Sequence, residues 1–349
     1  MKIGIVNDVP GVAALLQRVV GGDPAHRVVW IAGNGPEAIA LCAKETPDLI
    51  LMDMVMPVMD GVETTRRIMA TTPCPILIVT GSVRVNASRI FEAMGYGALD
   101  AVDTPLVGGA PSGEAARSLL SKIATVSRLV RDRRGRRSTA LSAHGLSNPP
   151  RRDRLVAIGS SAGGPAVLAA ILHGLPRDFP AAVVLVQHVD EQFAAGMATW
   201  LDESTALSVR VAKEGDRPTV GEVLLAASGD HLTLKAADRV GYTAHPIDYV
   251  YRPSVDVFFQ SVCRFWRGEV IGVLLTGMGR DGALGLKALR DSGHYTIAQD
   301  QATSAVYGMP KAAAAINAAV DILPAGRIAA KLIAVLAAGF ISPAPTTSP

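Results

Sequence analysis

The feature that most constrains the fold is an alternation of strand-like and helix-like segments that occurs twice along the chain. In residues 1–125, short apolar runs are separated by helix-length segments, and the runs are Ile3–Val6, Val28–Ala32, Leu49–Met52, Ile76–Thr80 and Leu99–Val102. Five strand–helix units in series predict an open parallel sheet, because parallel neighbours need crossover connections. We therefore expect a doubly wound α/β domain over residues 1–125, with a helix from about Glu114 to Val130.

The alternation restarts in the second half. The expected strands are Leu155–Ile158, Ala182–Gln187, Val270–Leu275 and Tyr295–Ala298, and the expected helices are Pro165–His173, Ser254–Trp266 and Ala283–Arg290. The stretch Val209–Lys235 has a pattern of short strands and turns, which suggests an antiparallel edge. A second open, mostly parallel α/β domain is predicted over residues 154–340, followed by a disordered tail over 341–349.

A polar, basic stretch separates the two halves. Nine arginines and only two aspartates lie between Arg128 and Arg154, which gives this stretch a charge of +7 in a chain whose net charge is +3. Such a run can bind nucleic acid or an acidic partner. However, no aromatic residues lie among the arginines, and no helix-turn-helix pattern follows the first domain. We interpret residues 126–153 as a solvated, flexible linker and expect no nucleic-acid partner.

Composition and cysteine usage narrow the cellular setting. Hydrophobic residues make up 49% of the chain and aromatic residues 5%, which is typical of aliphatic cores between helices and a parallel sheet. The three cysteines are isolated and form no disulfide framework or CxxC metal site. No secretory signal is evident, and the apolar stretch Leu332–Ile341 is far shorter than the ~20 residues of a membrane span. We expect a cytoplasmic protein without direct membrane insertion.

Two aspartates follow neighbouring strands of the first predicted sheet. Asp8 lies just after the first strand and Asp53 just after the third, where ligands bind in sheets of this kind. Each alone fits a turn former or helix cap, but two adjacent carboxylates repel each other unless a cation joins them. Mg²⁺ prefers such oxygen ligands. A metal-neutralised aspartate there could accept a phosphoryl group, and Thr80 could offer a hydroxyl to its oxygens.

The segment MDMVMPVMDG resembles the phosphoacceptor loop of response-regulator receivers, a flavodoxin-like (βα)5 family. The resemblance spans residues 1–125. It implies that Asp53 is the phosphoacceptor, that Thr80 is the switch residue, and that Mg²⁺ is bound by Asp8, Asp53 and the backbone carbonyl of Val55.

Two positions depart from the receiver pattern. Receivers usually have a pair of acids after the first strand, whereas the first of the two is Asn7 here. They also have a lysine before the proline that follows the fifth strand, whereas this chain has Thr104 before Pro105. The second change removes a cation expected to pair with the phosphoryl group. Both changes bear on metal affinity, phosphorylation and switching.

In the second half, a glycine-rich turn presents a serine. Gly159 to Gly163 satisfies G-x-S-x-G around Ser161, a strand-to-helix turn that exposes the serine hydroxyl above a sheet. The N-terminus of the following helix suits an oxyanion. A dinucleotide site would need GxGxxG and an acid at the end of the next strand. That strand ends in His188 instead.

A third loop supplies a carboxylate. The stretch TGMGRDG follows the strand VIGVLL and places Asp281 at the start of a helix. Taken singly, Asp281 fits a helix N-cap and His188 a structural histidine. Together with Ser161 they make Ser, His and Asp at one edge of a sheet, and triads are identified by geometry and roles rather than chain order.

The second half strongly resembles the catalytic domain of chemotaxis receptor methylesterases, the CheB family. The matching segments include IGSSAGGP, ASGDHL, YRPSVDVFFQSV, GVLLTGMGRDGALGL and TIAQDQATSAVYGMPKAA. The resemblance implies a hydrolase that removes methyl esters from receptor glutamates and deamidates receptor glutamines. It implies Ser161 as nucleophile, His188 as general base and acid, Asp281 as its orienting residue, and the N–H groups of Ala162 and Met278 as the oxyanion hole. Hydrolysis would need no metal or organic cofactor.

Two further residues lie in these segments. His231 in the ASGDHL segment is expected to have a turn role. Tyr251 stands where the family pattern has histidine, a change that could adjust substrate contact.

The resemblance also implies partners and a regulated activity. The phosphodonor would be a CheA-type histidine kinase, and the substrate would be the helical cytoplasmic bundle of a chemoreceptor. The segments IVND, LMDMVMPVMDG and ALDAVDTP look closer to methylesterases of Wsp-like surface-sensing arrays than to flagellar ones. The alternative is a catalytically silent response-regulator adaptor that binds receptor and kinase.

Overall fold

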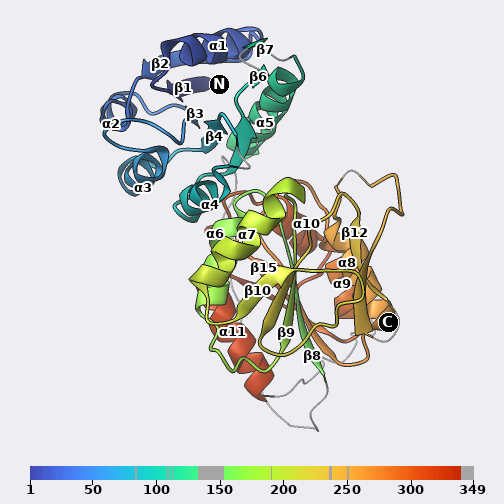
Figure 1. Cartoon of the computed structure of the whole chain (residues 1–349). Coiled ribbons are helices and arrows are strands. Elements are labelled where there is room, and N and C mark those ends of the chain that lie inside the picture. Colours follow the sequence, from blue (N-terminus) through green and yellow to red (C-terminus); the bar gives the residue numbers. More distant parts are fainter. Residues whose placement is uncertain are drawn as a thin grey trace. The chain divides into compact units, whose positions relative to one another are not determined.

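The computed structural model describes residues 1–82, 85–107, 110–111, 113–132, 153–189, 191–235, 238–249 and 251–338. The chain divides into two compact units, Met1–Ser138 and Thr139–Pro349 (Figure 1).

The start of the expected linker belongs to a helix. Helix α5 spans Gly113–Asp132, close to the helix expected from about Glu114 to Val130, so the segment interpreted as a linker begins with helical residues, 126–132. The apolar stripe of this helix continues through Leu119, Ile123 and Val126, all buried, with spacings of four and three residues. The rest of the expected linker, 133–152, and the expected tail, 341–349, lie outside the described residues.

The first unit is the expected doubly wound sheet. Its five parallel strands have the order β2-β1-β3-β4-β5, with bounds Lys2–Val6 (β1), Arg27–Ala32 (β2), Leu49–Met52 (β3), Ile76–Thr80 (β4) and Asp100–Asp103 (β5). Figure 1 shows α1 and α5 on one face and α2, α3 and α4 on the other. The remaining helices are Pro10–Gly21 (α1), Gly35–Lys44 (α2), Gly61–Thr71 (α3) and Ala87–Gly95 (α4). A short antiparallel pair, Leu106–Val107 (β6) with Ala110–Pro111 (β7), was not expected.

The second unit is built on a parallel sheet of seven strands in the order β10-β11-β9-β8-β14-β15-β16. The strands are Arg154–Ser160 (β8), Ala182–Gln187 (β9), Ser208–Val211 (β10), Glu222–Leu225 (β11), Glu269–Leu274 (β14), Tyr295–Gln299 (β15) and Asp321–Leu323 (β16). The first strand, β8, pairs with β9 on one side and β14 on the other. The strand order therefore reverses at β8, and ligands are expected at the carboxyl ends of these three strands.

Helices cover both faces of this sheet. Figure 1 shows α6 (Gly164–His173), α7 (Glu191–Ser204) and α11 (Ala325–Ala338) together on one face. The other face carries α8 (Val255–Phe265), α9 (Ala283–Asp291) and α10 (Met309–Ala315). In the described ranges, no helix combines the length and the apolar character that crossing a membrane requires.

The region Val209–Lys235 corrects the expectation of an antiparallel edge. Strands β10 and β11 extend the main sheet in parallel, with Val209 opposite Val223. Strands β12 (His231–Lys235) and β13 (Arg239–Thr243) pair antiparallel and form a separate hairpin. Val223, Leu224 and Leu225 are all buried, which is typical of a strand covered on both faces. The expected short strands are present, but their direction depends on partners outside the segment.

Helices α8 and α9 pack closely, with a buried carboxylate between them. A Cβ atom added at Gly285 would lie 2.7 Å from the Cβ of Phe259, so only glycine allows this approach. The carboxylate of Asp256 accepts a hydrogen bond of 2.6 Å from the Gly285 N–H. Burial, together with the nearby Asp281, raises the pKa of Asp256 from 3.8 to about 6, despite backbone hydrogen bonds that lower it.

This shift predicts that Asp256 costs stability at neutral pH. Because its folded-state pKa lies above the unfolded value, the folded state binds more protons between pH 3.8 and about 6. Stability is therefore lost as the pH rises through this window. As the pH rises from 5 to 8, wild type should lose about 1 kcal/mol of unfolding free energy that Asp256→Asn does not lose. Calorimetry of the full chain measures this difference.

The matched control is Asp178→Asn, which changes an exposed aspartate of the same unit. It controls for the loss of one carboxylate, and the pH-dependent change should be larger in Asp256→Asn. If the unfolding free energy of Asp256→Asn relative to wild type changes between pH 5 and pH 8 no more than that of Asp178→Asn, the raised pKa of Asp256 is contradicted.

Candidate active site

The predicted serine turn lies at the end of β8. Strand β8 ends at Ser160, and the Ser161 N–H donates to the Thr276 carbonyl at 3.0 Å. A Cβ at Gly159 would lie 2.2 Å from Val255 Cγ1, and Gly163 has a φ of 74°. Both glycines of the motif are thus required, one for close packing and one for a left-handed backbone.

A glutamine that the sequence reasoning missed joins the ends of β8 and β9. The Gln187 side chain accepts a hydrogen bond of 2.5 Å from Ser160 Oγ and donates one of 2.9 Å to the Ser161 carbonyl. It also donates to the His188 carbonyl at 3.2 Å, and the His188 N–H donates to the Ser160 carbonyl at 3.0 Å. The backbone positions of the serine and the histidine are therefore coupled. The only signal in the sequence was the Gln-His pair itself.

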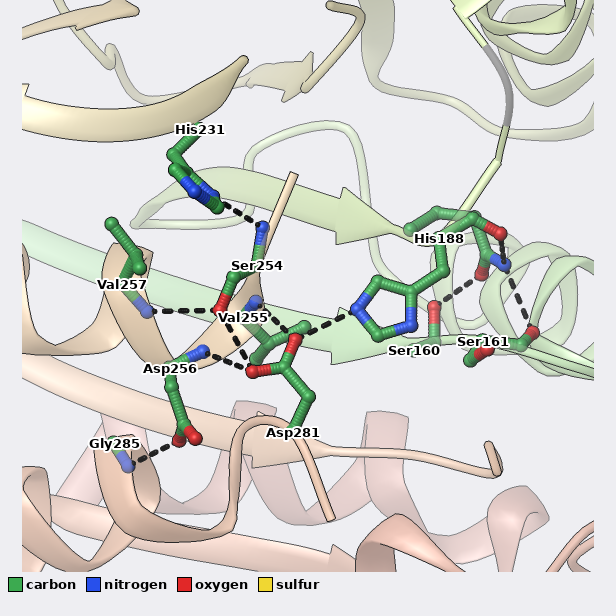
Figure 2. A network of polar contacts seen from close by, with 11 residues as sticks. Ser160, Ser161, His188, His231, Ser254, Val255, Asp256, Val257, Asp281 and Gly285 are labelled. Carbon is green, nitrogen blue, oxygen red and sulfur yellow. Dashed lines mark hydrogen bonds and ion pairs between the residues drawn. The ribbon is translucent and has the colours of Figure 1, made fainter. Parts of the chain in front are cut away.

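The predicted histidine and aspartate are in direct contact. His188 Nε2 and Asp281 Oδ2 are 2.8 Å apart, and the side chains are 8% and 6% exposed. The other ring nitrogen, Nδ1, is buried and has no hydrogen-bond partner among the described residues. Figure 2 shows Nδ1 on the side of the ring that faces Ser160 and Ser161. A carboxylate bound to Nε2 favours the tautomer with its proton there, which leaves the Nδ1 lone pair free to accept a proton.

The Asp281 carboxylate is held by the N-terminus of α8. Its Oδ1 accepts hydrogen bonds from Ser254 Oγ at 2.8 Å and from the Asp256 N–H at 3.1 Å, while Oδ2 also accepts from the Val255 N–H at 2.7 Å. Burial would raise the pKa of Asp281, but the hydrogen bonds from His188, Ser254 and Val255 outweigh it and lower the pKa below 3.8. Asp281 is therefore the anionic partner of His188 at neutral pH.

His231 corrects the expectation of a turn role. It is the first residue of β12, fully buried, and its Nδ1 accepts the Ser254 N–H at 3.1 Å. Its Nε2 lies 3.0 Å from the Pro246 carbonyl, so Nε2 holds the proton. Figure 2 shows the resulting chain of contacts from His231 through Ser254 and Asp281 to His188. His231 follows a Ser-Gly-Asp segment that is typical of a turn, and no local pattern indicates its contact with Ser254.

The loop after β14 lies directly against Ser161. A Cβ at Gly277 would be 2.7 Å from the Ser161 Cβ. The Gly277 N–H donates to the Val306 carbonyl at 3.0 Å, and the Gly277 carbonyl accepts from the N–H groups of Gly308 and Met309 at 3.1 and 2.9 Å. Among the described residues, the N–H groups of Ala162 and Met278 donate to no protein acceptor. Two free N–H groups beside a serine are what an oxyanion hole requires.

The predicted phosphoacceptor lies at the carboxyl edge of the first sheet. Asp53 follows β3, and its Oδ2 accepts a hydrogen bond of 2.8 Å from the Asn7 side-chain amide. The Val55 N–H lies 3.3 Å from the other carboxylate oxygen. Burial raises the pKa of Asp53, and the charge of Asp8 raises it further. The two carboxylates are therefore close enough for their charges to interact.

These residues suit a hard divalent cation. Asp8 disfavours the charge on Asp53, and no lysine or arginine hydrogen bond to Asp53 relieves it among the described residues. A Mg²⁺ ion held by the two carboxylates and the Val55 carbonyl would remove this repulsion. No group of three or more His, Cys, Asp or Glu side chains in the described ranges is arranged to hold a metal, so the backbone carbonyl and water would complete such a set.

The predicted switch residue is buried at the same edge. Thr80 is 1% exposed, and its hydroxyl accepts a hydrogen bond of 3.0 Å from the Asn86 side chain. Thr104, which replaces the usual lysine, donates its N–H to the Thr80 carbonyl at 2.8 Å and is itself buried. Position 104 therefore supplies no charge to this edge.

Family models of known proteins match both units of the chain. A family model described as CheB methylesterase matches residues 156–332, and one described as response regulator receiver domain matches residues 3–107. The crystal structure of the Thermotoga maritima CheB methylesterase catalytic domain matches with a TM-score of 0.50 and 37% identity, over 52% of this chain and 98% of that one.

Full-length relatives extend the match to the whole chain. A protein of Pseudomonas savastanoi pv. phaseolicola named protein-glutamate methylesterase/protein-glutamine glutaminase 3 is 59% identical over 96% of this chain and 99% of its own length. A protein of Mesorhizobium japonicum named protein-glutamate methylesterase/protein-glutamine glutaminase is 57% identical over 95% and 98%. This chain belongs to the CheB methylesterase family, in the form that joins a receiver domain to the methylesterase domain.

Proposed function

We propose that this chain hydrolyses methyl esters on glutamate side chains of chemoreceptors and deamidates receptor glutamines, using Ser161, His188 and Asp281. The observation that most supports the assignment is the buried, unpartnered Nδ1 of His188, on a ring whose Nε2 is bound to Asp281. In His231, by contrast, both ring nitrogens are paired.

In the proposed acylation step, Ser161 Oγ attacks the γ-carbonyl carbon of the ester. His188 Nδ1 takes the serine proton, and the resulting imidazolium is stabilised by Asp281. The N–H groups of Ala162 and Met278 receive the negative charge that develops on the carbonyl oxygen. Such base assistance contributes ~10²–10⁴ in rate, and one oxyanion donor ~10²–10³.

The leaving group then departs and the enzyme is regenerated. Imidazolium returns its proton to the methoxide, which leaves as methanol, or to the amine of a glutamine, which leaves as ammonia. Water attacks the acyl-enzyme with its proton passing to His188, and Ser161 is released with a glutamate carboxylate as product. No step requires a metal.

We further propose that phosphorylation of Asp53 controls this activity, with a CheA-type histidine kinase as phosphodonor. Mg²⁺ bound by Asp8, Asp53 and the Val55 carbonyl would neutralise the transferred phosphoryl group. Thr80 is the proposed switch residue. Because the substrate is the cytoplasmic helical bundle of a receptor, the proposed site of action is the cytoplasm. Membership of the Wsp-like surface-sensing branch stays a prediction.

The adaptor alternative lacks a specific observation in its favour. A silent adaptor would not need a base with a free nitrogen or two unpaired N–H groups beside a serine. The reaction-based experiment below separates the two possibilities.

Replacing the nucleophile should abolish turnover. Ser161→Ala removes the attacking oxygen, so methanol release from a methylated receptor should fall by at least about 10³-fold. Labelling with a fluorophosphonate, mapped by mass spectrometry, should modify Ser161 and disappear in the variant.

The neighbouring serine provides the control. Ser160→Ala removes only a hydroxyl that donates to Gln187, so labelling at Ser161 should persist and turnover should stay within about tenfold of wild type. Equal activity of Ser161→Ala and wild type would exclude Ser161 as nucleophile.

The receiver should respond to a small-molecule phosphodonor. With acetyl phosphate and Mg²⁺, the esterase rate of the wild type should rise several-fold, because a phosphoryl group adds nearly two negative charges at Asp53. In Asp53→Asn the ratio of rates with and without acetyl phosphate should stay near one. A stimulated rate in that variant would place the phosphorylation elsewhere.

A further inference from the structure

We propose that Tyr251 is a positioning residue that holds the imidazole of His188 in its reactive orientation. The inference rests on the proposed function of His188 as general base. It concerns a residue that is tyrosine here where the family pattern has histidine.

The two rings lie flat against each other. Their centroids are 4.4 Å apart and their planes differ by 4°. The His188 side chain is only 8% exposed, so one face of the imidazole is covered by Tyr251 rather than by water.

The hydrogen bond to Asp281 alone does not define the ring orientation. A single contact at Nε2 fixes the position of one atom, and the ring can still tilt about that contact. In the part of the chain that the structure describes, Nδ1 has no hydrogen-bond partner to prevent such a tilt. A parallel aromatic face prevents it, because tilting would drive ring atoms into the tyrosine. Asp281 therefore constrains the ring at its edge and Tyr251 constrains its plane.

The stacked ring also favours the charged intermediate. When His188 takes the proton of Ser161 it becomes a cation, and the face of a tyrosine ring is negative. The attraction is stronger for imidazolium than for neutral imidazole, so it stabilises the transition state more than the ground state. This effect should appear in kcat rather than in KM.

The backbone that bears Tyr251 is anchored to the same network. Three residues further on, Ser254 donates its hydroxyl to Asp281 and its N–H to His231. On its other side Tyr251 lies against the loop after β14, since a Cβ at Gly279 would be 3.3 Å from the tyrosine oxygen. Tyr251 thus contacts both the base and the loop of the proposed oxyanion donor Met278.

The test compares three variants in steady-state methanol release from a methylated receptor. Tyr251→Ala should lower kcat about tenfold with KM changed by less than about threefold. Tyr251→Phe keeps the ring and should retain at least about half of the wild-type kcat. Tyr249→Ala is the matched control: it removes a ring of the same segment that meets His231 edge-on at 5.9 Å, and kcat should stay within about threefold.

Three results would overturn the proposal. They are an unchanged kcat in Tyr251→Ala, an effect confined to KM, or a loss in Tyr251→Phe as large as in Tyr251→Ala. Two other results would contradict the proposed function itself: a wild type without esterase activity, or an active Ser161→Ala variant. Neither result depends on the Tyr251 variants.

Discussion

The arrangement of the second unit depends on one buried carboxylate. Asp281 accepts hydrogen bonds from His188, Ser254, Val255 and Asp256, which come from β9's carboxyl end and the first turn of α8. Removing a carboxylate from water is costly unless its oxygens are fully hydrogen-bonded. Here backbone N–H groups at a helix N-terminus supply much of that compensation. The same contacts bring the histidine, the helix and the loop after β14 to one point.

Both units place chemistry at the carboxyl edge of a parallel sheet where the strand order reverses. In the first, Asp8 and Asp53 follow the neighbouring strands β1 and β3. In the second, Ser161 and His188 follow β8 and β9, and the loop bearing Asp281 follows β14. The first edge brings two carboxylates close together, whereas the second pairs a carboxylate with an imidazole. The difference lies in the loops, because the sheets share the same geometry.

Much of this was predictable from local patterns. The parallel strands of the first unit, and β8 and β9 of the second, followed from apolar runs and turn residues. The direction of β10 and β11 did not, because a short buried strand can pair either way until its neighbours are known. The helix expected from about Glu114 to Val130 is α5, Gly113–Asp132, because its apolar stripe is visible in the sequence. Only the linker boundary at residue 126 was wrong, since it cut into this helix.

The sequence by itself determined the two α/β units, the family, and the residue types at each strand end, since these depend on periodicity and on motifs contiguous in the chain. Only the tertiary structure decided how those residues meet. The pairing of His188 Nε2 with Asp281, the bond from Ser254 to His231 and the stacking of Tyr251 all join segments far apart in sequence or on different elements. Their contacts arise from packing around a common sheet edge, and packing geometry has no local signature in the order of amino acids.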